Sequence, residues 1–166
     1  MSEKAKSKTP WIILTILTAL YALNFMDRMI VAVSMEAIKA DFNFTDTQIG
    51  MVQSIFFLGV GLLTIPAGVL VDRWSRRKAI SLMAVIWSLA TAATGVSRNF
   101  VSILTSRFVV GAGEAGFHPG GFAWIADIFP KEKRATAGGI FQMGVIVGCI
   151  VGMVAGGWLI TKTGDW

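Results

Sequence analysis

Four ionisable side chains lie inside stretches that are otherwise apolar: Asp27 and Arg28 in an early stretch, and Arg107 and Glu114 in a later one. A carboxyl group in such a place can load and release a proton, because burial favours its neutral form and a nearby arginine favours its charged form. A planar guanidinium can hold a carboxylate through two hydrogen bonds. We therefore predict proton coupling at Asp27 and Glu114, and binding of an organic anion by Arg28 and Arg107.

One helical face in the later stretch carries a polar stripe, made of Arg107, Gly111, Glu114 and His118. A stripe of this kind must face protein or water rather than lipid. Pro119 has no backbone N–H to donate, so we expect it to kink this helix near the stripe. His118 is predicted to contact the substrate; the alternative is a neutral histidine that donates to a backbone carbonyl.

Two neutral polar side chains are expected to join this site. Asn24 precedes Asp27 by three residues and so lies near the same helical face. Gln142 is predicted to be a buried side chain that faces a cavity and binds substrate, with an interhelical hydrogen bond as the alternative. For the charged residues, the alternative is that they only pair with one another and hold two helices together.

The elements that must position these side chains are helices that cross a membrane. The chain has 166 residues, of which 54% are hydrophobic and 15% are charged. Apolar runs of about 20 residues are long enough to cross about 30 Å of hydrocarbon, and only a helix satisfies its own backbone there. We predict an all-α polytopic membrane protein with five spans, at 11–35, 47–71, 79–96, 101–125 and 136–160.

Basic residues are concentrated before the first span, between the second and third, and between the fourth and fifth. By the positive-inside rule, these segments are cytoplasmic, and residues 1–10 form a cytoplasmic tail. This distribution explains the net charge of +5 without a nucleic-acid partner. We expect an integral membrane protein of the bacterial inner membrane with its N-terminus in the cytoplasm, and four further spans argue against a cleaved signal peptide.

Enzyme chemistry finds little support in the sequence. One histidine and one cysteine, far apart, make no metal-ligand cluster, and there is neither a nucleophile–base set nor a nucleotide-binding loop. We therefore expect no enzymatic activity, no metal and no cofactor. The expected partners are a small organic anion, protons and the lipid bilayer.

A basic loop joins the second and third spans. Asp72 ends a helix there and needs a positive partner, because the helix dipole opposes an acid at a C-terminus. The loop resembles the signature loop of the major facilitator superfamily, although Ser75 stands where that pattern has a second glycine. The resemblance assigns a gating role to the matching residues, which are Gly68, Asp72, Arg73, Arg76 and Arg77.

Two further segments resemble the same superfamily. Arg107 and the segment from Gly111 to Ala115 are similar to its fourth-helix motif. The segment from Asn24 to Arg28 resembles the first helix of the anion:cation symporters and of the spinster-like lipid transporters, with Phe25 where many relatives have tyrosine. The resemblance implies that the Asp-Arg pair and the acid of the fourth helix take part in proton coupling and substrate binding.

The fifth predicted span carries glycines at every fourth position: Gly144, Gly148, Gly152 and Gly156. This spacing is typical of helices that pack closely. The glycines also fit the superfamily's antiporter motif, but Met153 occupies the position of its proline. We therefore interpret the glycines as a packing surface and do not infer antiport.

The resemblance implies a twelve-helix fold of two six-helix halves, with the substrate site between them. Residues 11–166 would form an incomplete N-terminal half, which needs the missing C-terminal part as its partner. We expect a proton-coupled symporter of a small organic anion such as a sugar acid. The alternatives are a spinster-like carrier of lysolipids or other amphiphiles, and a non-transporting membrane receptor or assembly subunit.

Overall fold

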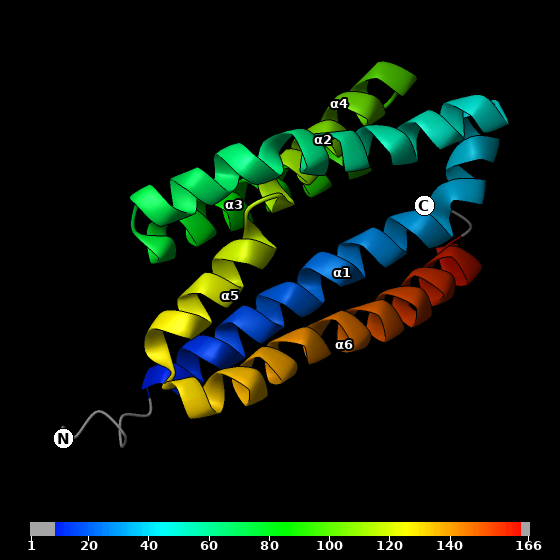
Figure 1. Ribbon diagram of the computed structural model, residues 1–166. Helices are drawn as coiled ribbons and strands as arrows, with labels where there is room; N and C mark the ends of the chain where they lie inside the picture. Colours follow the sequence, from blue (N-terminus) through cyan, green and yellow to red (C-terminus); the bar gives the residue numbers. More distant parts are fainter. Residues whose placement is uncertain (1–8, 164–166) are drawn as a thin grey trace.

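The computed structural model describes residues 9–163, and every regular element in that range is an α-helix (Figure 1). The predicted all-α class is therefore confirmed for these residues. Most of the predicted tail at 1–10 lies outside the described residues, as do the last three residues of the chain. The helices are α1 (Thr9–Phe42), α2 (Asp46–Arg73), α3 (Arg76–Gly95), α4 (Phe100–Glu114), α5 (Phe117–Ile128) and α6 (Lys131–Thr163).

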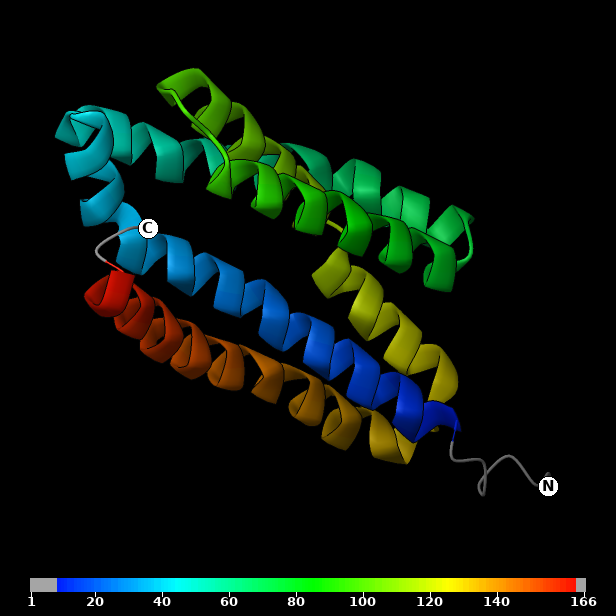
Figure 2. The same cartoon turned by 180° about the vertical axis from the view of Figure 1, so that it is seen from behind.

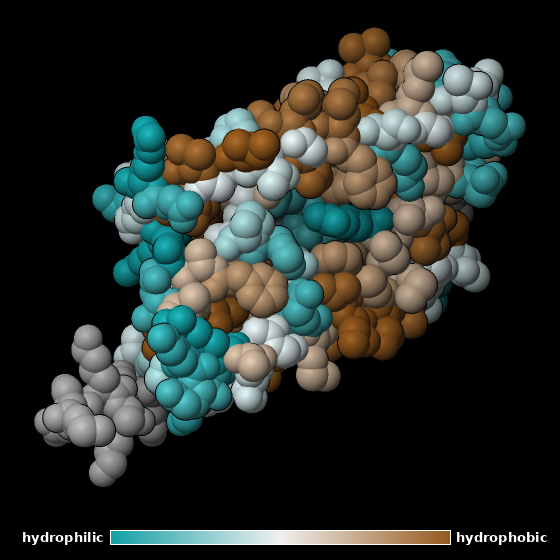
Figure 3. Space-filling view, in the orientation of Figure 1, coloured by the Kyte–Doolittle hydropathy of each residue, from teal (hydrophilic) through white to brown (hydrophobic). Residues whose placement is uncertain are grey.

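Four of these helices, α1, α2, α3 and α6, are long and apolar enough to cross a membrane. Large apolar side chains such as Ile65, which is 77% exposed, cover much of the outer surface (Figure 3). Such a surface suits lipid, which solvates apolar side chains without the cost that water imposes. The helices also extend beyond the predicted apolar runs, since polar turns continue α1 to Phe42 and start α6 at Lys131.

The predicted fourth span is two helices rather than one kinked helix. α4 ends at Glu114 and α5 begins at Phe117, so the break precedes Pro119. Pro119 cannot donate a hydrogen bond to the carbonyl of Ala115, and Gly116 weakens the same turn. The expected interruption near the polar stripe is therefore present, but as a break between two helices rather than a kink in one, and His118 does not continue the face of α4.

α1 and α6 lie side by side in both views (Figures 1 and 2). The glycines of α6 make this contact close. A Cβ atom at Gly144 would lie 2.6 Å from the carbonyl oxygen of Thr18, and one at Gly152 would lie 2.7 Å from that of Met26. No side chain fits in that space, so the predicted packing role of these glycines is confirmed.

α2, α3 and α4 form a second group, which α5 connects to the α1–α6 pair (Figure 2). α2 and α4 touch through their backbones, because a Cβ atom at Gly59 would lie 2.6 Å from the carbonyl oxygen of Phe108. Aromatic rings join the groups at α5. Phe117 packs edge-on against Trp87 of α3 and lies 5.8 Å from the ring of Tyr21 in α1. The two groups leave a recess between them, which is lined by residues of α1, α2, α4 and α5.

Candidate functional site

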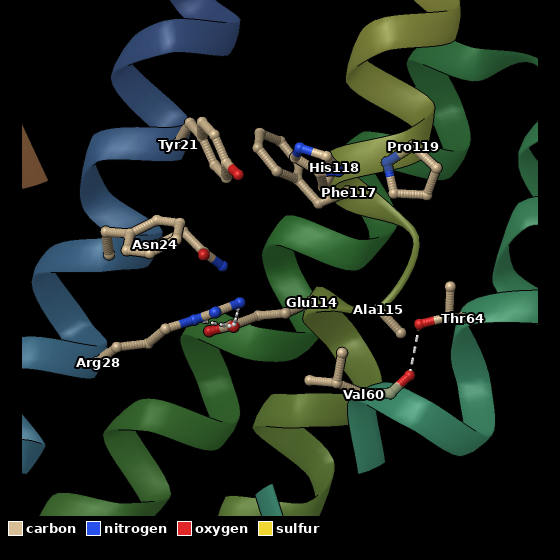
Figure 4. Close-up of a pocket in the computed structure, with 11 residues that line it drawn as sticks. Tyr21, Asn24, Arg28, Val60, Thr64, Glu114, Ala115, Phe117, His118 and Pro119 are labelled. Atoms are coloured by element: carbon tan, nitrogen blue, oxygen red, sulfur yellow. Dashed lines mark hydrogen bonds and ion pairs between the residues drawn. The ribbon is translucent and has the colours of Figure 1, made fainter. Parts of the chain in front are cut away.

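An ion pair joins the two helix groups inside this recess. The Nε and Nη2 atoms of Arg28 lie 2.8 and 2.6 Å from the Oε2 atom of Glu114 (Figure 4). The Glu114 side chain is fully buried, whereas that of Arg28 is 25% exposed. Glu114 is the last residue of α4, where the helix dipole opposes a negative charge, so the arginine of α1 compensates for both burial and position.

The ion pair forms part of the wall of a cavity of about 300 Å³. Tyr21 and Phe25 contribute from α1, and Phe117 and His118 contribute from α5 (Figure 4). His118 belongs to α5, which is a separate helix after the break. It therefore lines this cavity although it does not lie on the face of α4 that carries Glu114. The cavity therefore combines one ion pair with aromatic rings, which is typical of sites that bind a small organic molecule.

Polar atoms near the ion pair have no partner among the described residues. Asn24 is 1% exposed, and neither its amide nitrogen nor its amide oxygen makes a hydrogen bond there. The Oε1 atom of Glu114 is buried and equally unpaired. Figure 4 shows the Asn24 amide pointing toward the ion pair. Buried polar atoms that are left unsatisfied cost free energy, so a ligand or water is expected to complete these hydrogen bonds.

Asp27 does not share this cavity, although it is adjacent to Arg28 in the chain. It lines a separate cavity of about 350 Å³, together with Ser88 and Thr91 of α3. Adjacent residues of a helix point about 100° apart, which explains the separation. The structure thus brings Arg28 and Glu114 together and leaves Asp27 on another face of α1.

Arg107 is also set apart from the cavity wall. It is 2% exposed, and its guanidinium carbon lies 4.7 Å from the centre of the Phe56 ring. Its Nε and Nη1 atoms have no hydrogen-bond partner among the described residues. In this conformation Arg107 does not reach the cavity, so its role in substrate binding remains a prediction.

Gln142 is exposed on α6 and is not among the residues that line the cavity. The expectation that it is buried is therefore wrong. Its neighbours explain this: Phe141 and Gly144 are buried against α1, and Gln142 turns away from that contact. Its predicted substrate contact remains untested by this arrangement.

The signature loop contributes a polar link at another part of the molecule. Arg76 donates to Asp127 and to the carbonyl oxygen of Ala123, both in α5, and its Nη2 atom lies 4.0 Å from the carboxylate of Asp72. Arg76 is therefore the positive partner that the structure places near Asp72. Arg73 and Arg77 are exposed, and Gly68 has open space where a side chain would lie.

Two residues of these networks were not predicted from the sequence. Asp127 follows the fourth apolar run by two residues, so its position near a basic loop was a usable signal. The sequence gives no signal for Phe56, because a phenylalanine in an apolar helix is usually a packing residue.

A polytopic helical bundle with a buried acid–arginine pair beside a cavity is the arrangement of a membrane transporter. The family model described as Major Facilitator Superfamily matches residues 17–166. The chain belongs to this superfamily and is an integral membrane protein.

Individual relatives agree with this assignment. The chain is 33% identical to Protein spinster homolog 1 of Xenopus tropicalis, over 93% of this chain and 30% of that protein. It is 30% identical to the Hexuronate transporter of Bacillus subtilis, over 91% of this chain and 36% of that protein. The crystal structure of a bacterial homolog of the human lysosomal transporter Spinster, inward-facing and occupied, matches with a TM-score of 0.90 and 35% identity, over 96% of this chain and 35% of that one. The chain thus spans about a third of the length of these proteins.

Proposed function

We propose that this chain supplies the proton-coupling and anion-binding groups of a secondary transporter that moves an organic anion together with protons. The observation that carries the proposal is the ion pair between Arg28 and Glu114 at the cavity wall. Both arginine nitrogens meet one carboxylate oxygen, and the other oxygen is unpaired. The pair therefore places an anion-binding group, Arg28, next to a proton-binding group, Glu114.

The expected cycle follows from charge. A proton on Glu114 removes the negative charge that holds Arg28, and the guanidinium becomes free to bind the anionic group of a substrate. The incoming anion then neutralises Arg28 in the place of Glu114. When the proton leaves, Glu114 competes for Arg28 again and displaces the substrate. Asp27, in its own cavity, is proposed as a second proton site.

The proposed substrate is a sugar acid. Its carboxylate suits Arg28, and its hydroxyl groups suit the unpaired amide of Asn24 and the imidazole of His118 in the cavity wall. The similarity to the Hexuronate transporter of Bacillus subtilis supports this choice.

A second substrate class is favoured by other observations. The cavity has an aromatic wall formed by Tyr21, Phe25 and Phe117, and the chain is 33% identical to Protein spinster homolog 1. A lysolipid also offers an anionic group for Arg28, and its chain would lie along the aromatic rings. We propose this amphiphile carrier as the alternative to the sugar-acid symporter.

We propose a cytoplasmic N-terminus in a bacterial inner membrane. The start of α1 and the α2–α3 and α5–α6 connections all lie at one end of the molecule (Figure 1). Both connections are rich in basic residues, which are Arg73, Arg76, Arg77, Lys78, Lys131, Lys133 and Arg134. Basic charge gathered at one end supports the proposed orientation.

The test is uptake by a complete transporter that carries this chain, reconstituted in liposomes with an imposed proton gradient. A radiolabelled sugar acid and a radiolabelled lysolipid are compared, each with and without a protonophore. Uptake of the sugar acid that collapses with the gradient supports the first proposal, and lysolipid uptake supports the alternative. Uptake that ignores the gradient refutes proton coupling. Specific binding of the panel without any uptake would favour a receptor.

A further inference from the structure

Phe56 of α2 lies against two arginines, Arg28 of α1 and Arg107 of α4. Its ring centre is 5.0 Å from the guanidinium carbon of Arg28 and 4.7 Å from that of Arg107. A cation near the face of an aromatic ring is attracted by the ring quadrupole, more strongly when water is excluded. Phe56 is 1% exposed, so water does not weaken these contacts. One ring thus contacts two cations that come from different helices.

The position of Phe56 is fixed by its backbone. A Cβ atom at Gly111 would overlap the carbonyl oxygen of Phe56, so α2 and α4 touch at this residue. Arg107 lies one turn before Gly111 on α4, and Glu114 ends the same helix. The backbone that carries the ring therefore cannot move away from α4 without separating the two helices.

Without the Phe56 ring, unpaired polar atoms would favour movement of Arg107 toward Glu114. Its Nε and Nη1 atoms have no hydrogen-bond partner among the described residues, and the same holds for the Oε1 atom of Glu114. The two residues are seven positions apart, which places them on one helical face about 10 Å apart along the axis. An extended arginine and a glutamate can bridge that distance. The contact with Phe56 is one interaction that opposes such a movement of the Arg107 guanidinium.

We infer that Phe56 is a positioning residue, whose ring holds Arg107 away from Glu114 so that Arg28 alone pairs with the carboxylate. This inference rests on the proposed function, because a carboxylate held by two arginines would resist the proton that is proposed to free Arg28. The ionisable groups that face Glu114 are Arg28 and Tyr21 from α1, Arg107 from α4 and His118 from α5. From α2, the groups that face it are the uncharged Phe56, Val60 and Thr64.

The first test compares F56L and F56Y in the complete transporter. Leucine removes the ring and keeps an apolar side chain, whereas tyrosine keeps the ring. F56L is expected to shift the pH for half-maximal uptake toward acid by about one unit, because a second arginine would favour the charged carboxylate. F56Y is expected to keep the wild-type profile. The matched control is F57L, since Phe57 is the next residue and is 63% exposed.

The second test does not depend on transport. The thermal stabilities of F56L, R107M and the double variant are measured in detergent. If the ring holds Arg107, R107M costs clearly less stability in the F56L background than in the wild type. Additive effects, or an F56L profile that matches F57L, would overturn the inference. A wild-type transporter without pH-dependent uptake would instead refute the proposed function, and the stability comparison would still show whether the ring holds Arg107.

Discussion

Arg28 and Glu114 are 86 residues apart in the chain, and two nitrogens of the arginine meet a single oxygen of the glutamate. The contact links α1 to the end of α4 across the recess between the two helix groups. It differs from a fork-to-fork pair, in which both carboxylate oxygens are used. A proton can therefore arrive on the unpaired oxygen before the ion pair opens. In the proposed cycle, binding of the proton to Glu114 would precede release of Arg28.

Replacement of Glu114 by glutamine should separate exchange from proton-driven accumulation. E114Q is a permanent mimic of the protonated acid, so Arg28 stays free to bind the anion. We expect exchange of labelled for unlabelled substrate to continue, while accumulation driven by a proton gradient falls by about a hundredfold. Both activities are measured in the same liposomes.

The matched control for this variant is E36Q, which makes the same change at an exposed turn of α1. It should leave exchange and accumulation as in the wild type. Proton-driven accumulation by E114Q at the wild-type rate would show that the coupling proton binds elsewhere, and Asp27 would then be the residue to replace.

Arg28 is expected to require its guanidinium as well as its charge. Lysine keeps the charge but cannot present two nitrogens in a fixed fork. We predict that R28K raises the KM for an anionic substrate by about tenfold or more, with a smaller change in the maximal rate. R98K, at an exposed arginine, is the control. An unchanged KM in R28K would exclude Arg28 as the anion-binding group.

The helices could be predicted because membrane spans impose a simple requirement on composition. Runs of apolar residues indicated α1, α2, α3 and α6, whose ends differ from the predicted ones by several residues, whereas the predicted fourth span is two helices. The glycine spacing of α6 indicated its close contact with α1. The interruption near the polar stripe was predicted from Pro119, but as a kink in one helix rather than a break between two helices. An isolated sequence shows that Pro119 removes a hydrogen bond, but the tertiary packing decides which turn opens.

Some of the residues that line the cavity were predicted from the sequence, but their contacts were predicted only in part. Charge inside an apolar run identified Arg28 and Glu114, since such residues are rare without a function. Which of two adjacent residues faces the cavity depends on how α1 is rotated, and rotation is set by its packing against α6. The rotation of α1 also decides that Asp27 faces a separate cavity. The rotation of α6 in the same contact decides that Gln142 is exposed, and neither rotation can be read from the sequence.

Gly111 should tolerate no side chain. A Cβ atom there would overlap the carbonyl oxygen of Phe56, which belongs to the backbone of α2 and cannot rotate away. We predict that G111A lowers the stability by about 1–3 kcal/mol, as overpacking does in other cores. G61A is the control, because Gly61 of α2 has open space at this position. G61A should keep or raise the melting temperature, since alanine favours a helix. Equal melting temperatures for both variants would contradict the close contact.

The link between Arg76 and Asp127 should depend on the two charges being opposite. The contact joins the start of α3 to α5, and Asp72 lies near the same arginine. R76D would place three acids together, so we predict a lower melting temperature and a loss of transport. The double variant R76D/D127R restores an opposite pair in the reverse orientation and should recover part of both.

The control for this charge reversal is R77D, which changes the neighbouring exposed arginine by the same amount. It alters the charge of the basic loop but leaves the link to Asp127 intact, so its melting temperature should stay near that of the wild type. If R77D and R76D behave alike, the loop acts through its total charge, which orients the protein in the membrane. If R76D/D127R recovers melting temperature and transport that R76D has lost, the pairing of α3 with α5 matters. The reversed pair restores the contact without restoring the charge of the loop.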